Sequence, residues 1–185
     1  MSNLTDLPSD ARYAVVSVLL HWLTVIGVIG LMVSGIIMVD LSYYSAWYTT
    51  LPYHHKAFGV LLIGVIAARL MVRWTRGVPD PIAKSPLLAR FIHSYHGLLY
   101  ALLALVLFSG YLIPTNKGQG IDLWGIFTAP ALAFTTNTND QWLGDIHEWG
   151  AYFLGALAVF HALAALKQHF FDRSIAMKLM LGIKT

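Results

Sequence analysis

The sequence predicts an all-α membrane protein, a bundle of four transmembrane helices. Three observations support this fold class. First, 57% of the 185 residues are hydrophobic and only 11% are charged, a balance outside the range of ordinary soluble domains. Second, the chain contains apolar runs close to the roughly 20 residues that a helix needs to cross a bilayer. Third, no β-type alternation and no soluble domain separates these runs.

Each apolar run is expected to form one membrane-spanning helix. The runs cover residues 13–39, 54–73, 92–113 and 146–167. The first two connections, 40–53 and 74–91, are short enough to join adjacent antiparallel helices. We therefore expect the whole chain, residues 1–185, to form a single transmembrane domain.

The third connection, residues 114–145, exceeds the usual length of a connection in a compact domain. Its segment 121–134 is apolar, but Gly125 and Pro130 interrupt it. We expect a short interfacial helix or a lid on the outer, periplasmic face of the bundle. A loop that simply packs on the helix ends is the alternative.

The distribution of positive charge predicts the orientation in the membrane. Lys and Arg are concentrated in the second connection and in the C-terminal tail, whereas the first and third connections carry few basic residues. Short loops rich in Lys and Arg stay in the cytoplasm. The second connection and the C-terminus are therefore predicted to be cytoplasmic, and four spans place the N-terminus there too.

Two histidines of the last run, His147 and His161, are the first candidates for a functional site. Fourteen residues separate them, so on a helix they point within roughly 40° of one another and differ in depth by about 21 Å. Histidines inside a membrane span usually face the bundle interior and have a function. The alternative is that both are interior histidines that bond to neighbouring helices.

Two other histidines match these two in depth. His21 lies near the cytoplasmic end of the first run, at the level of His161, and His55 lies at the outer start of the second run, at the level of His147. Two pairs at two depths are what two stacked haems with bis-histidine ligation require. With both axial positions filled, such haems transfer electrons and leave no site at the iron for substrate.

Composition excludes several other classes of site. The chain has no cysteine, which rules out disulfides, iron–sulfur clusters and covalently attached c-type haem. A zinc or copper site would need three or four ligands at one depth, and the spacing shows no such cluster. The net charge of +3 is spread over loops, so a nucleic-acid partner is not expected.

At these residues the sequence resembles the bacterial cytochrome b561 family, which belongs to a larger group of dihaem membrane cytochromes that includes the cytochrome b subunits of hydrogenases and formate dehydrogenases. The resemblance runs along essentially the whole chain. The residues that carry it are His21-Trp22, His55-x3-Gly59 followed by Arg69, His93-x2-His96, Asn116-Lys117-Gly118, and His147-Glu148 with His161 fourteen residues on.

The resemblance implies a multi-pass protein of the bacterial inner membrane with two non-covalent b-type haems. His21 and His161 would hold the cytoplasmic-side haem, and His55 and His147 the periplasmic-side haem. These are the same pairs that depth alone predicts. His96 is the rival for the cytoplasmic-side ligand. Arg69 lies fourteen residues after His55 and is a candidate contact for a haem propionate or a quinone, with a snorkelling arginine at the helix end as the alternative.

Among similar proteins, superoxide oxidases take electrons from superoxide at the periplasmic face and reduce ubiquinone. Superoxide:ubiquinone oxidoreductase activity is therefore one expectation, and simple electron transfer from another small periplasmic donor or redox protein is the other. A funnel for a small anion needs basic residues at its mouth. Only Lys56 and Lys117 are candidates for this role, because the first outer connection, 40–53, contains no Lys or Arg.

A quinone site would need polar, titratable groups near a haem on the cytoplasmic side. The candidates are His93, His96, Gln168 and His169. Two further hypotheses remain. The chain could instead anchor a separate dehydrogenase or hydrogenase as its cytochrome b subunit, or it could be a transporter or proton channel that uses its histidines as a relay. Co-purification of a large redox subunit would identify the anchor, and a colourless protein would favour the transporter.

Overall fold

The structure is a computed structural model that describes residues 15–77, 85–132, 141–172 and 174–182. It contains four long helices, one short helix and one two-stranded hairpin. In chain order these are α1 (Val15–Val39), α2 (Thr50–Arg76), α3 (Pro86–Thr115), β1 (Ile121–Leu123), β2 (Phe127–Ala129), α4 (Gln141–Phe170) and α5 (Ala176–Met180).

Local sequence signals explain where α3 begins and where α2 ends. Ser85 caps α3, since its Oγ accepts a hydrogen bond from the Leu88 amide at 3.2 Å and Pro86 follows at the first helical position, where proline is favoured. Gly77 ends α2 with a φ of 72°, a positive value that glycine adopts readily because it has no Cβ. By contrast, Thr49 makes no side-chain cap at the start of α2.

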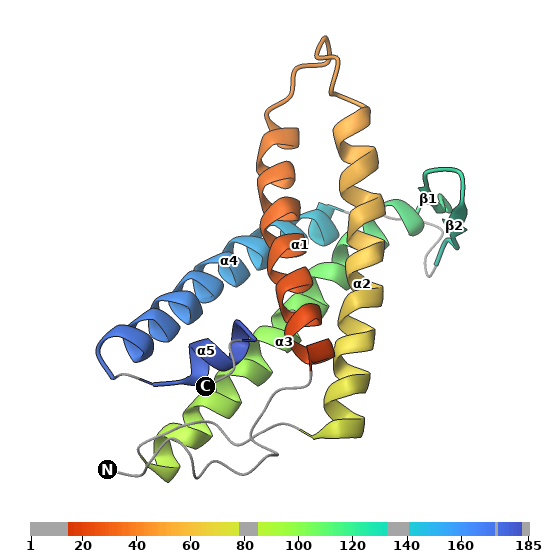
Figure 1. Cartoon of the computed structure of the whole chain (residues 1–185). Helices are drawn as coiled ribbons and strands as arrows, with labels where there is room; N and C mark the ends of the chain where they lie inside the picture. The colour runs from red at the N-terminus through yellow and green to blue at the C-terminus, as the bar shows by residue number, and fades with distance from the viewer. Residues whose placement is uncertain (1–14, 78–84, 133–140, 173, 183–185) are drawn as a thin grey trace.

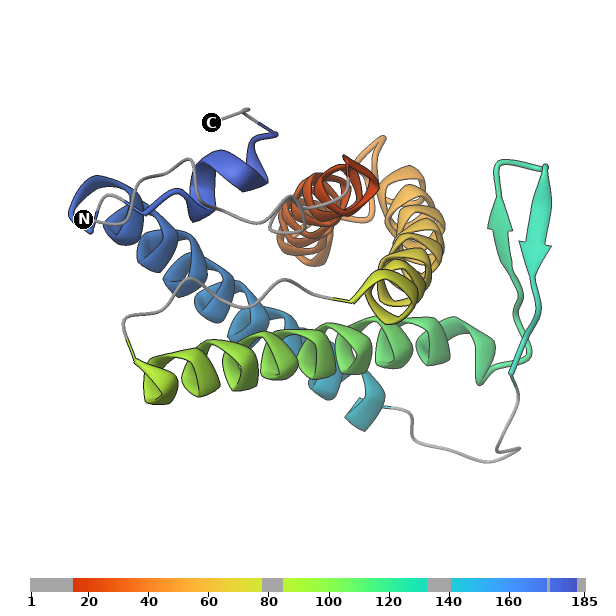
Figure 2. The ribbon, with the colours of Figure 1, turned by 60° about the horizontal axis from the view of Figure 1, so that its bottom comes forward.

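The four long helices form two helix pairs. In Figure 1, α1 and α2 lie side by side and run in opposite directions, and α3 and α4 form the second pair. Figure 2 shows the first pair nearly end-on while α3 and α4 lie across it, so the second pair runs obliquely to the first. Contacts of α3 with α2 join the two helix pairs.

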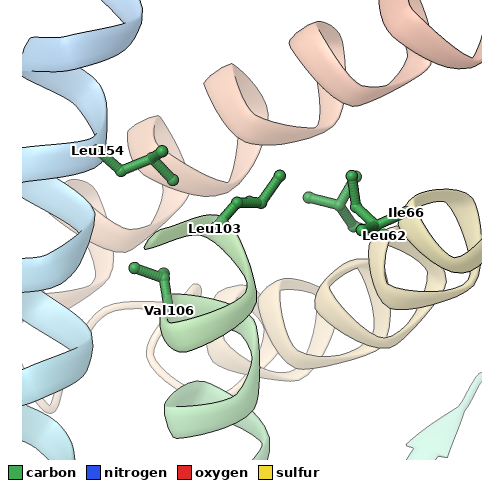
Figure 3. Packing of buried hydrophobic residues seen from close by; sticks show 5 residues of the cluster. All are labelled: Leu62, Ile66, Leu103, Val106 and Leu154. Carbon is green, nitrogen blue, oxygen red and sulfur yellow. The ribbon is translucent and has the colours of Figure 1, made fainter. Parts of the chain in front are cut away.

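The apolar core lies where the two helix pairs meet. Leu62 and Ile66 of α2 point towards Leu103 of α3. Val106 of α3 points instead towards α4, the helix that carries Leu154 (Figure 3). All five side chains are buried. Most other large apolar side chains on the long helices are exposed, which is the distribution expected for helices that face lipid.

All four long helices are long and apolar enough to cross a membrane. Their most apolar windows have a mean hydropathy between 1.6 and 2.4, and at most 28% of the residues in any of these windows are buried within the protein. Each predicted run, as far as it is described, lies within one of these helices, although residues 13 and 14 of the first run lie outside the described residues.

Three of the helices are longer than the apolar runs indicate. The structure starts α2 at Thr50 rather than residue 54, α3 at Pro86 rather than residue 92, and α4 at Gln141 rather than residue 146. The extra turns mix apolar residues with polar or charged ones, among them Thr50, Arg90 and Asp145. A polar or charged residue interrupts the apolar run, whereas the backbone hydrogen bonding of the helix continues past it.

The third connection contains a β-hairpin. Ile121–Leu123 pairs antiparallel with Phe127–Ala129, so a short helix in this part of the connection was a wrong expectation. Trp124 and Gly125 have φ of 54° and 74°, and the Ile126 amide donates to the Leu123 carbonyl at 3.0 Å. These are the features of a type I′ turn, which turns the chain before a helix can form. Residues 133–140 of the connection lie outside the described residues.

Candidate functional site

Two of the predicted histidines meet between α2 and α4. The ring centroids of His55 and His147 are 6.1 Å apart and the ring planes are nearly perpendicular, at 85°. Both side chains are half-buried. We call His55 and His147 the two-histidine site.

Hydrogen bonds fix the tautomer of both rings in this site. His147 Nδ1 lies 2.8 Å from the Val106 carbonyl oxygen, which only accepts, so Nδ1 carries the proton. Ser34 Oγ donates its single proton to the Leu31 carbonyl at 3.0 Å, so His55 Nδ1, at 3.0 Å from the same oxygen, must be the donor there. In both histidines Nε2 is therefore left unprotonated and able to bind a metal.

Two glycines leave room for these rings. A Cβ on Gly110 of α3 would lie 2.5 Å from His147 Cε1 and 2.7 Å from its Nδ1, and a Cβ on Gly35 of α1 would lie 3.4 Å from His55 Cε1. The first contact is shorter than real Cβ atoms show. His147 therefore occupies space that only a glycine at position 110 provides.

A second cluster gathers three histidines from three helices. His21 of α1, His96 of α3 and His161 of α4 are half-buried, and all three lie within electrostatic range of Arg69 of α2. The rings of His96 and His161 are 5.1 Å apart between centroids. We call these residues, with Arg69, the three-histidine site.

The tautomers in this second cluster differ from those in the first. Arg69 Nη2 lies 2.9 Å from His21 Nδ1, and because a guanidinium only donates, Nδ1 of His21 is the acceptor. A neutral His21 then carries its proton on Nε2. His96 has the opposite tautomer, since its Nδ1 lies 2.9 Å from the Ile92 carbonyl oxygen.

Aromatic side chains of α3 complete the three-histidine site. The Tyr100 ring lies under two guanidinium groups, with Arg69 Cζ at 5.3 Å and Arg73 Cζ at 5.7 Å from its centroid, both within cation–π range. The Tyr95 ring stacks on His161 at 6.2 Å with an interplanar angle of 11°. The Tyr95 hydroxyl also donates to the Leu157 carbonyl of α4 at 2.6 Å.

The remaining predicted residues lie outside these two clusters. His93 is exposed and bonds to the Ala89 carbonyl of its own helix at 3.2 Å. Gln168 and His169 lie in the last turn of α4, where His169 Nδ1 is buried without a hydrogen-bond partner. Lys56 and Lys117 are exposed. Of the four quinone candidates, the structure brings only His96 into the three-histidine site.

Four site residues were missed by sequence reasoning: Ser34, Tyr95, Tyr100 and Gly110. The first apolar run contains Ser17, Thr24 and Ser34, so a hydroxyl in this run does not by itself identify Ser34. Gly110 gives no signal of its own, because spacing does not tell which of many helical glycines faces a histidine on another helix.

A family profile described as prokaryotic cytochrome b561 matches residues 12–182. The chain is also similar to "Cytochrome b561 homolog 2" of Escherichia coli strain K12, with 38% identity over 181 residues, which cover 97% of this chain and 95% of that protein. The match therefore includes both histidine sites and the hairpin between α3 and α4.

Proposed function

Because the chain belongs to the prokaryotic cytochrome b561 family, and is therefore a multi-pass membrane protein, we propose that it carries electrons across the membrane through two b-type haems, between a periplasmic donor and the quinone pool. The observation that carries the proposal is the pair of histidine sites, both served by α4. His147 contributes to one and His161 to the other, fourteen residues apart.

The two-histidine site fits a haem iron without any change in its hydrogen bonds. Both Nε2 atoms are unprotonated, and both rings are oriented by a hydrogen bond from Nδ1 to an oxygen acceptor. Such partners usually fix the tautomer of a ligating histidine and raise its basicity. We assign His55 and His147 as the two residues that would hold this haem.

The three-histidine site fits a haem iron after one change of hydrogen bonding. Binding through Nε2 of His21 requires Arg69 to stop donating to Nδ1. A haem propionate is an acceptor that suits a guanidinium, with quinone contact the alternative for Arg69. We assign His21 and His161 as ligands, following their matched depth. His96 has a free Nε2 and remains the rival for one of these positions.

Haem b supplies reversible exchange of single electrons at its iron. The chain supplies the rest. Its four assigned histidines would hold the two haems, and its apolar helices keep the sites in a medium of low polarity. Polar residues of α3 and of the end of α4 are the candidates for delivering protons to a quinone. His93, His96, Gln168 and His169 are these candidates.

The absorption spectrum of the purified chain, expressed with adequate haem supply, tests the proposal. We expect a Soret band and two haems per chain. A colourless protein would overturn the proposal.

Single alanine variants test the ligand assignment. His147→Ala should remove one haem and leave the other, whereas His21→Ala and His161→Ala should each remove that other haem in a redox titration. If His96→Ala removes it and His21→Ala does not, His96 replaces His21 as the ligand.

A further inference from the structure

The β-hairpin packs on the first two turns of α2, beside the two-histidine site. Ala57 of α2 has no exposed surface and forms a buried cluster with Ile121, Leu123 and Ala129 of the hairpin. The Tyr111 hydroxyl of α3 donates to the Pro130 carbonyl at 2.6 Å, which fixes the chain leaving the hairpin.

Two polar contacts join the hairpin to residues next to His55. The Tyr53 hydroxyl donates to Asp122 Oδ2 at 2.7 Å, and Trp124 Nε1 donates to His54 Nδ1 at 3.0 Å. The Trp124 ring also stacks on His54, with centroids 6.3 Å apart, and meets Phe58 edge-on at 5.1 Å. Residues 53, 54, 57 and 58 are thus all held from the hairpin side.

His55 itself points away from the hairpin, towards α1 and α4. Successive side chains on a helix are about 100° apart, so His54 faces the hairpin while His55 faces Ser34 and His147. The start of α2 lacks a side-chain cap, and an uncapped helix start frays unless other contacts hold it. Fraying here would displace His55.

The backbone at Trp124 is a second, independent observation. A φ of 54° is unusual for a bulky residue, and asparagine or glycine is preferred at this position of a type I′ turn. Such strain persists only where surrounding contacts over-determine it. At Trp124 these contacts are those of its side chain with His54 and Phe58.

We propose that the hairpin is a clamp on the start of α2 and that Trp124 is a positioning residue for the haem ligand His55. This inference rests on the proposed function, because it takes His55 to be a ligand. The clamp fixes the helix turns on which His55 stands. It thereby determines how slowly the haem of the two-histidine site dissociates and what midpoint potential this haem has.

The test compares Trp124→Gly with Ile126→Ala in the purified full-length protein. Glycine suits the left-handed backbone at position 124, so this change relieves the turn and removes only the side-chain contacts. Ile126 lies in the same turn and is 86% exposed, which makes it the matched control. Tyr53→Phe removes one clamp hydrogen bond and keeps the ring.

We expect Trp124→Gly to speed hydrogen exchange of the backbone amides of residues 50–58 by roughly fivefold, the factor that corresponds to the loss of one net hydrogen bond. The haem removed by His147→Ala should dissociate several-fold faster and show a shifted midpoint potential, while the other haem is unchanged. Tyr53→Phe should act in the same direction and more weakly, and Ile126→Ala should match the wild type.

Slower exchange in Trp124→Gly, as relief of turn strain alone would give, would overturn the proposal. So would equal effects on both haems, which indicate general destabilisation, or no effect on either. A wild-type protein without haem would overturn the proposed function instead, and the exchange measurement would still report whether the hairpin holds α2.

Discussion

At the scale of single residues, the atom bonded to each Nδ1 determines what a histidine in this protein can do. Carbonyl and hydroxyl oxygens hold Nδ1 of His147 and His55 as donors, whereas the guanidinium of Arg69 holds Nδ1 of His21 as an acceptor. Histidines that look alike in the sequence are thus in different chemical states in the structure.

Gly110→Ala should weaken haem binding at the two-histidine site. Alanine normally stabilises a helix by about 1 kcal/mol relative to glycine, but here its Cβ would lie 2.5 Å from the His147 ring. The ring has to move, so we expect about one haem per chain instead of two, measured as the haem-to-protein ratio. Gly97→Ala, on the same helix with nothing within 4 Å of the added Cβ, is the control and should keep both haems.

Sequence reasoning located the histidines because their periodicity and depth follow from helix geometry alone. It also named Arg69 as a candidate contact for a haem propionate or a quinone, which stays a prediction. It could not predict that Arg69 bonds to His21, or that Ser34 and Gly110 border the other site. Those contacts depend on how neighbouring helices are rotated and offset, which one sequence does not reveal.

At the scale of elements, hydrogen bonds between helices hold the sites together. The hydroxyl of Tyr95 on α3 donates to the Leu157 carbonyl on α4, while its ring stacks on His161. One residue therefore joins the helix pair and supports a candidate ligand.

Tyr95→Phe should lower thermal stability while leaving the haem content unchanged. The phenyl ring still stacks on His161, and only the hydrogen bond is lost, at a cost of roughly 0.5–1 kcal/mol. Thermal unfolding in detergent measures the effect. Tyr152→Phe on α4, where the tyrosine is 41% exposed, should unfold at the wild-type temperature. A Tyr95→Phe protein as stable as wild type would show that the bond contributes nothing.

The elements themselves were predictable to different degrees. The four long helices follow from hydropathy, whereas the residues at which α2, α3 and α4 begin do not. The hairpin was not predicted, although Trp124-Gly125 occupies the turn between two short apolar segments. Its residues Ile121 and Leu123 bury against Ala57 of α2, a long-range contact that outweighs the helical tendency of this stretch.

At the scale of the whole molecule, the family assignment made from the sequence is confirmed, and so is the placement in a membrane as a multi-pass protein. The direction of electron flow and the donor stay predictions. Lys56 and Lys117 are exposed near the hairpin end of the molecule, one beside Ala57 and the other four residues before Ile121. This location suits a role in attracting an anionic donor.

If superoxide is the donor, haem reduction by a superoxide pulse should slow as ionic strength rises, because exposed charges are screened over about 10 Å at 0.1 M salt. Lys56→Gln combined with Lys117→Gln should slow the reaction and flatten its salt dependence without changing the haem spectrum. Stopped-flow absorbance measures the rate, and Lys178→Gln on α5 is the control. A wild-type protein that superoxide leaves oxidised, while a quinol reduces it, has a different donor.

The helix α4 fixes the distance between the two histidine sites. His147 and His161 lie fourteen residues apart on this uninterrupted helix, so their separation of about 21 Å along the axis and their relative direction are set together. Inserting one residue between them would turn one site by about 100° relative to the other, and no side-chain adjustment could restore both. Inserting two whole turns, about seven residues, would keep the facing and lengthen the gap. The length of this one segment is therefore under tighter constraint than its composition.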